Sequence, residues 1–142
     1  MSSLFYPYDL GPIHLKNRIV MAPMERSCVR NLDWVPEAET ARYFSQRAGA
    51  GLIVTCSIAI SEWARTWAFE PGLCTAAQIE GWQRVTREVH DRGGVLFGQL
   101  LHGGHASHVS HQPNCQAPVS STETGADESD LHGLRCEWYP FG

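Results

Sequence analysis

Short apolar segments alternate along the chain with segments of helical pattern, and this alternation constrains the fold more than any other feature. Apolar and β-branched runs occupy residues 19–22, 52–55 and 95–101. Residues 36–47 and 75–92 lie between them and carry helix signals. Strands that are apolar along their whole length are typical of parallel sheets buried on both faces, and strands that alternate with helices build α/β architectures. The order predicts an α/β fold, and the pattern alone leaves a barrel and an open doubly wound sheet as alternatives.

The second helical segment carries the clearest start and stop signals. Thr75 is a good N-cap residue, and Gln78 three residues later completes a capping-box pattern. Apolar residues then recur at steps of three and four, namely Ile79, Trp82, Val85 and Val89. Gly93 and Gly94 end the pattern. We therefore predict a helix whose buried face holds these four apolar residues.

Composition narrows the class of protein. A hydrophobic content of 43% and a charged content of 18% are typical of a globular domain. The net charge of −4 disfavours nucleic acid and anionic membranes as partners, and no window holds the ~18 apolar residues of a membrane span. Five scattered cysteines and the lack of a signal peptide favour reduced thiols in the cytoplasm.

No GxGxxG motif follows any strand, which disfavours a dinucleotide fold.

Residues 99–121 read QLLHGGHASHVSHQPNCQAPVSS and join a polar strand end to a loop rich in glycine and histidine. Four histidines recur there at three-residue spacing, namely His102, His105, His108 and His111. On one helical face such a set could ligate zinc. Gly103, Gly104 and Pro113 disfavour a helix here, so a histidine-loop metal site ranks last among the functional hypotheses and no metal ligand is assigned.

Several separate motifs together resemble one enzyme family. Residues 15–24 read LKNRIVMAPM, and residues 43–55 read YFSQRAGAGLIVT. Gly81-Trp82 and Val89-His90 follow in the second helical segment. With Gln99 and the loop after it, these motifs resemble the Old Yellow Enzyme family of FMN-dependent ene-reductases, from residue 4 to residue 121.

The resemblance implies a fold and a cofactor. Residues 1–121 would be the N-terminal segment of a flavin-binding TIM (β/α)8 barrel, about three β/α units long, and residues 122–142 an irregular polar and aromatic tail. The cofactor would be FMN, with NAD(P)H as reductant.

The same resemblance implies the residues that would bind the flavin. Pro23 and Met24 would pack against the ring, and Ser57, just past the second strand, would meet its edge. Gln99 would bind the pyrimidine end, where a side-chain amide matches alternating donors and acceptors.

Glu25 departs from the family pattern, which has Thr or Cys at this position beside the flavin. We assign it to the cofactor site, because a carboxylate there would oppose the charge of the reduced flavin and lower its potential. The alternative is that Glu25 turns to solvent or pairs with Arg26. Leu101 stands on the substrate side where many relatives have Trp, so the substrate preference is not carried over from the family. His105 replaces the Arg of the usual HxGR pattern, so an anion contact there is not carried over either.

By resemblance, the activity would be hydride transfer from NAD(P)H through FMN to an activated alkene. The family's substrate-binding pair, proton-donating Tyr and phosphate-binding residues would fall beyond residue 142, so no catalytic residue is assigned. We expect a truncated chain that cannot complete catalysis alone, and self-association or a complementing chain through the exposed sheet edge. A completed barrel would take a small-molecule substrate. The alternative is a non-enzymatic remnant or a small interaction protein without flavin.

Overall fold

The computed structural model describes residues 3–27, 29 and 31–121. The expected tail, residues 122–142, lies outside the described residues, as do Cys28 and Cys136. Among the described residues, no helix is both long and apolar enough to cross a membrane. The elements in chain order are η1 (Ser3–Phe5), β1 (Tyr8–Leu10), β2 (Ile13–Leu15), β3 (Val20–Met21), α1 (Ala38–Ser45), β4 (Leu52–Ala59), α2 (Ala76–His90), β5 (Leu96–Leu101), η2 (Gly104–Ala106), η3 (Val109–His111) and η4 (Pro113–Cys115).

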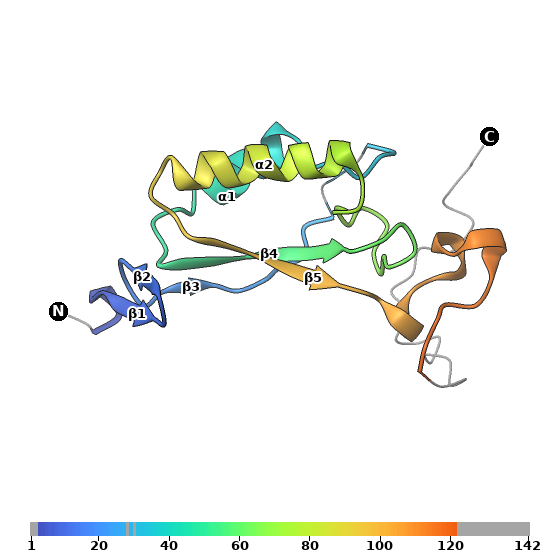
Figure 1. The fold of residues 1–142 in the computed structure, drawn as a ribbon, viewed down its shortest axis with the longest axis horizontal. Helices are drawn as coiled ribbons and strands as arrows, with labels where there is room; N and C mark the ends of the chain where they lie inside the picture. The colour runs from blue at the N-terminus through green and yellow to red at the C-terminus, as the bar shows by residue number, and fades with distance from the viewer. Residues whose placement is uncertain (1–2, 28, 30, 122–142) are drawn as a thin grey trace.

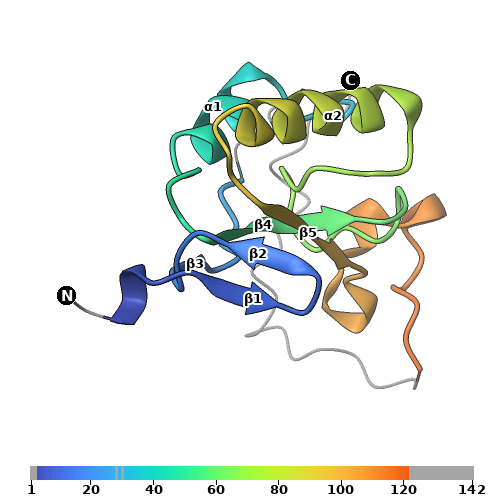
Figure 2. The ribbon, with the colours of Figure 1, turned by 60° about the vertical axis from the view of Figure 1, so that its left-hand side comes forward.

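A three-stranded parallel sheet with the order β3–β4–β5 forms the centre of the fold. Helix α1 connects β3 to β4, and α2 connects β4 to β5. Both helices lie on the same face of the sheet, and the strands point away from the β1–β2 hairpin (Figures 1 and 2). The predicted α/β class is therefore confirmed, with each crossover made by a helix.

Two strands differ in length from the sequence expectation: β3 is shorter and β4 is longer. Strand β3 is only two residues long, because Pro23 has no backbone N–H to continue a ladder. Strand β4 runs on to Ala59, four residues past the expected end, and buries Cys56 and Ile58 as it does so. Ser57 therefore lies inside the strand, where the sequence placed it just beyond.

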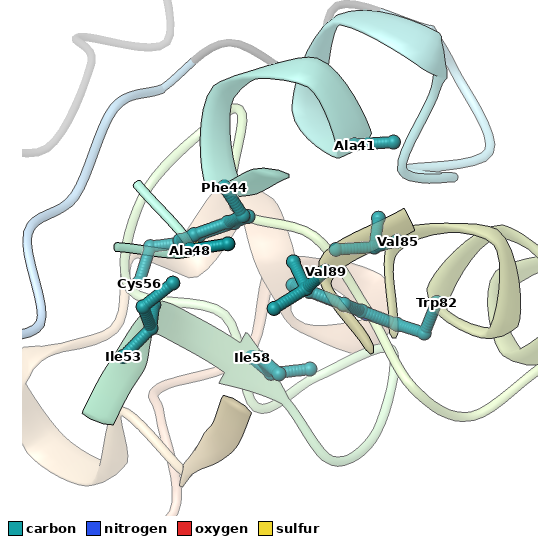
Figure 3. Close-up of a cluster of buried hydrophobic side chains, with 9 residues drawn as sticks. All are labelled: Ala41, Phe44, Ala48, Ile53, Cys56, Ile58, Trp82, Val85 and Val89. Carbon is teal, nitrogen blue, oxygen red and sulfur yellow. The ribbon is translucent and has the colours of Figure 1, made fainter. Parts of the chain in front are cut away.

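The hydrophobic core lies between the helices and the sheet. Figure 3 shows side chains from α1, β4 and α2 that meet there. The cluster consists of Ala41, Phe44, Ala48, Ile53, Cys56, Ile58, Trp82, Val85 and Val89. Three of the four residues predicted for the buried face of α2 belong to it. Ile79 does not, since its side chain is 45% exposed, and that part of the prediction was wrong.

The predicted capping box at the start of α2 is confirmed. Thr75 Oγ1 accepts from the backbone N–H of Gln78, and Gln78 Oε1 accepts from the backbone N–H of Thr75, both at 3.2 Å. The Gln78 side chain is buried and also donates to the backbone oxygen of Asp33 at 2.8 Å. The cap thus fixes α2 to the loop that follows β3, in addition to satisfying the first turn of the helix.

The amino ends of the strands are closed by polar contacts from the segment that precedes β3. Lys16 Nζ donates to the backbone oxygens of Ala48 and Gly93, which follow α1 and α2. Asn17 Nδ2 donates to the backbone oxygen of Gly49 at 2.9 Å. A Cβ on Gly51 would lie 2.0 Å from the backbone oxygen of Asn17, so only glycine allows this approach.

Candidate functional site

The predicted site residues gather at the carboxyl ends of the parallel strands. Pro23, Met24 and Glu25 directly follow β3, Ser57 lies near the end of β4, and Gln99 lies in β5. In Figure 1 this end of the sheet faces the loops after β5 and is opposite to the hairpin. Carboxyl ends of parallel strands are where α/β proteins bind ligands.

Ser57 and Gln99 are opposite each other because β4 carries one extra residue. Val54 pairs with Phe97, but Ser57 pairs with Gln99, so the register shifts by one between the two pairs. At the shift, Thr55 Oγ1 accepts from the backbone N–H of Gln99 at 3.0 Å. Side chains alternate along a strand, so Ser57 and Gln99 face away from the helix-covered core. The Gln99 side-chain amide makes no hydrogen bond within the described part of the chain.

Glu25 is held in place by three donors. Its Oε1 accepts from the backbone N–H groups of Arg26 at 2.8 Å and Ser27 at 2.7 Å, and its Oε2 accepts from Ser57 Oγ at 2.8 Å. The Arg26 guanidinium lies over the Tyr43 ring, 5.1 Å from the centroid. The sequence left open that Glu25 pairs with Arg26. In the structure Glu25 contacts the backbone N–H of Arg26, whereas the Arg26 side chain contacts Tyr43. The Glu25–Ser57 contact links the β3 and β4 ends.

Pro23 and Met24 present exposed side chains beside these polar groups. Met24 is 54% exposed, although a methionine is ordinarily buried. An apolar surface of this kind next to an unpaired amide suits a flat heteroaromatic ligand better than it suits an ion.

Glu70 is a buried carboxyl at the same end, and the sequence analysis missed it. The loop after β4 returns beside that strand, where Ala59 pairs with Gly72, and this return buries Glu70 completely. Its Oε2 accepts from the backbone N–H groups of Thr66 at 2.7 Å and Trp67 at 3.3 Å. Its Oε1 is buried without a partner among the described residues.

The pKa of Glu70 is raised above that of an ordinary glutamate. Loss of hydration on burial is the main cause, and the charge of Glu25 adds to it. The hydroxyl of Ser57 and the backbone donors of Thr66 and Trp67 offset part of the rise. The one available sequence signal was an acidic residue within the otherwise apolar Ala-Phe-Glu-Pro run.

The loops after β4 and β5 are tied to each other. Ser107 Oγ donates to the backbone oxygen of Arg65 at 2.6 Å, and Gln112 Nε2 donates to that of Trp63 at 2.9 Å. The Arg65 guanidinium stacks on Trp34, 3.4 Å from the ring centroid. These contacts hold the two loops together beside the strand ends, although the bonded residues are more than 40 positions apart in the sequence.

The histidine-rich loop folds into three short 3-10 turns and not into one helix. His102 and His105 are exposed, whereas His111 packs beside Arg65. Burial lowers the pKa of His111, and the positive charge of Arg65 lowers it further. Within the described ranges, no three His, Cys, Asp or Glu side chains are placed to hold a metal ion.

The chemistry of the site is compatible with an isoalloxazine ring. The unpaired amide of Gln99 can both donate and accept, as the pyrimidine edge of a flavin requires. Met24 and Pro23 offer apolar contact beside it. Glu25 is the unusual member, since its carboxylate brings negative charge to this edge. Parallel β/α units with such a site at their strand ends are typical of the class of β/α proteins that bind a ligand at this edge.

Comparison with known proteins identifies the family. The sequence model of the NADH:flavin oxidoreductase / NADH oxidase family matches residues 3–138. The chain therefore belongs to this family, and it corresponds to the N-terminal portion of Old Yellow Enzyme-like proteins, as the motifs indicated. The family is defined by flavin and by a nicotinamide reductant, so the expectation of FMN and NAD(P)H is confirmed at family level.

Individual relatives agree with this assignment. The 12-oxophytodienoate reductase 1 of Oryza sativa subsp. japonica is 40% identical over 121 residues, which are 84% of this chain and 31% of that protein. The solved structure of morphinone reductase is 42% identical, with a TM-score of 0.83, and covers 89% of this chain and 33% of its own. An Old Yellow Enzyme homologue from Zymomonas mobilis is 41% identical with a TM-score of 0.73, over 78% of this chain and 31% of its own. The chain spans about a third of these relatives.

Proposed function

We propose that this chain forms the first strands of a (β/α)8 barrel and the flavin-facing edge of an FMN-dependent NAD(P)H oxidoreductase. The observation that carries the proposal is the convergence of Glu25, Ser57 and Gln99 at the strand ends, with the Gln99 amide unpaired. FMN, when bound, supplies hydride transfer from a nicotinamide to an activated alkene. The cytoplasm suits the scattered cysteines, and we propose it as the location.

Each residue at the strand ends has a separate task in this proposal. Gln99 orients the ring through its amide, because the bulge at Thr55 holds its backbone in place. Pro23 and Met24 exclude water from one side of the ring. Glu25 is fixed by Ser57 and raises the cost of placing negative charge at this edge.

Titration of the purified chain with FMN, followed by flavin fluorescence, tests the proposal. We expect saturable binding, and we expect Gln99→Leu to weaken it about tenfold, since two hydrogen bonds of ordinary strength are lost. Gln83→Leu is the matched control, because Gln83 is exposed on α2, and it should bind like wild type. Equal affinity of the two variants would contradict the role of Gln99, and absence of binding by wild type would contradict the proposal itself.

We further propose that the outer edges of the sheet receive additional strands, from a longer chain or from a partner chain. Among the described residues, β3 and β5 each pair only with β4, and Val20, Phe97 and Leu100 are 40% to 60% exposed. Unpaired edges with apolar side chains favour strand addition. Light scattering after size exclusion should therefore give a mass above that of one chain, and a monomer at all concentrations would contradict self-association.

A further inference from the structure

The histidine-rich loop contains a repeated hydrogen bond that the proposed function does not use. His102 Nδ1 accepts from the backbone N–H of Gly104 at 3.0 Å, and His108 Nδ1 accepts from that of Ser110 at 3.2 Å. Each imidazole thus caps the short turn that follows it, as an asparagine or aspartate side chain does when it accepts from the N–H two residues on. Two of the four histidines in the motif therefore have the same local role.

These caps require neutral imidazoles. An imidazole nitrogen accepts only while it carries no proton, and an imidazolium carries a proton on both nitrogens. Proton binding by His108 would therefore convert Nδ1 from an acceptor into a donor and leave the N–H of Ser110 without this partner. The hydroxyl of Ser110 lies 2.8 Å from the same nitrogen and can donate or accept, so the backbone N–H is the group that senses the proton.

His111 favours a neutral ring for a different reason. Its Nδ1 lies 3.4 Å from the backbone oxygen of Arg65, and because a carbonyl only accepts, this nitrogen carries the proton. A second proton would go to Nε2 and give the ring a positive charge.

The surroundings of His111 would oppose that charge. The charged and titratable groups that face it are Arg65, from the loop after β4, and His108, from its own loop, whose ring centroid lies 6.4 Å from that of His111. Both would be positive in acid and would repel a protonated His111. Among the described residues, no carboxylate lies within ion-pair distance of either imidazole.

The turn that holds these two histidines lies between two anchors that do not titrate. Before it, the buried Ser107 donates through Oγ to the backbone oxygen of Arg65 at 2.6 Å. After it, the buried Gln112 donates through Nε2 to the backbone oxygen of Trp63 at 2.9 Å and to Ser107 Oγ at 3.0 Å. The anchors are independent of pH, whereas the side-chain contacts of residues 108–111 between them depend on protonation.

We propose that residues 108–111 form a pH-sensitive turn, which packs against the loop after β4 while His108 and His111 are neutral and is released when they bind protons. Histidine is the side chain whose charge ordinarily changes between pH 5 and pH 8, so mild acid is enough for release. Since the turn lies beside the carboxyl ends of the strands, its release would loosen the loops next to the candidate site. The proposal goes beyond the proposed function and does not depend on flavin binding.

Hydrogen–deuterium exchange of the flavin-free chain at pH 7.5 and pH 5.5 tests this proposal, with the rates corrected for the intrinsic effect of pH on exchange. In wild type we expect the protection of residues 108–112 to fall about tenfold in acid, because a hydrogen bond of ordinary strength is lost. Helix α2 should keep its protection over the same range.

The double variant His108→Asn, His111→Gln removes both titrating rings. Asparagine can accept from the N–H two residues on, and glutamine can donate to the backbone oxygen of Arg65, so both contacts have a replacement that does not titrate. We expect its protection of residues 108–112 to be the same at both pH values. His90→Gln is the matched control, because His90 is exposed at the end of α2, and it should respond to pH like wild type.

Three results would overturn the proposal. The first is equal protection of residues 108–112 at both pH values in wild type. The second is a fall in the double variant as large as in wild type, and the third is a parallel fall in α2, since acid would then act on the whole fold. The wild-type comparison decides the proposal even if the double variant does not fold.

Discussion

The layer between the helices and the sheet differs from the layer at the carboxyl ends of the strands in the forces that hold it together. In the first, side chains such as Phe44, Ile53 and Val85 are buried among one another, and burial of apolar area stabilises them. In the second, Ser57 donates to Glu25, Glu70 accepts from two backbone N–H groups, and one buried oxygen of Glu70 is left unpaired.

The apolar layer therefore mainly stabilises the fold, whereas the polar layer at the strand ends forms the candidate site. Apolar packing needs only side chains of the right size and period, so it tolerates many sequences. A buried carboxyl oxygen that lacks a donor, such as Glu70 Oε1, weakens the fold, and such groups are typical of functional sites. Substitutions in the two layers should therefore change different measured quantities, and three experiments test that separation.

The largest effect should come from the apolar layer. Trp82→Ala removes a buried indole between α1 and β4 together with its hydrogen bond to Gly72, and should lower the free energy of unfolding by about 3–5 kcal/mol. Urea denaturation followed by circular dichroism measures this change. Ile79→Ala, on the exposed side of the same helix, should cost less than about 1 kcal/mol. Similar losses for both variants would mean that α2 does not pack as described.

An intermediate effect should come from Glu70 and should depend on pH. The folded-state pKa of Glu70 is raised, so the folded chain keeps a proton that the unfolded chain releases. Its contribution is fully present below the ordinary glutamate pKa and is lost as pH rises toward the raised value, by at most about 1.4 kcal/mol per pH unit.

Glu70→Gln should remove this pH dependence, because a glutamine side chain does not titrate. The half-buried His111 gives the opposite slope, because its pKa is lowered, but it is common to both proteins and cancels in their difference. The measurement is the free energy of unfolding from pH 4 to pH 8 for each protein. Parallel curves would show that Glu70 does not titrate differently in the folded state.

The smallest effect should come from Glu25 and should leave stability almost unchanged. Glu25→Gln removes negative charge from the proposed flavin edge, so the midpoint potential of bound FMN should rise by on the order of 30 mV, or about 1.4 kcal/mol for two electrons. Spectroelectrochemical titration measures it. Glu80→Gln, at an exposed position on α2, should not change the potential. An unchanged potential in Glu25→Gln would contradict the hypothesis that Glu25 lowers the potential of the flavin.

Much of the apolar layer could be predicted from the sequence, because helix period and capping are local signals. The capping box of Thr75 and Gln78 and the buried face of α2 both follow from residues within one or two turns. Ile79 was misassigned, since a spacing of three or four residues does not fix the width of the buried stripe.

The site could be predicted only in part. The positions of Pro23 and Met24 follow from the proline that ends the first apolar run, whereas Gln99 lies inside β5 and was assigned from the family resemblance. The Glu25–Ser57 contact joins residues 32 positions apart, and no local pattern encodes it. Glu70 was missed because its burial depends on the loop after β4 turning back along that strand.

At the bulge in β4, a threonine hydroxyl replaces a backbone carbonyl as a hydrogen-bond acceptor. Thr55 is buried, and its Oγ1 takes the backbone N–H of Gln99 that a carbonyl would otherwise receive. Valine has nearly the same shape as threonine but lacks the hydroxyl, so Thr55→Val would leave the backbone N–H of Gln99 without this acceptor. The pairing of Ser57 with Gln99 thus depends on the buried hydroxyl of Thr55 as well as on backbone hydrogen bonds.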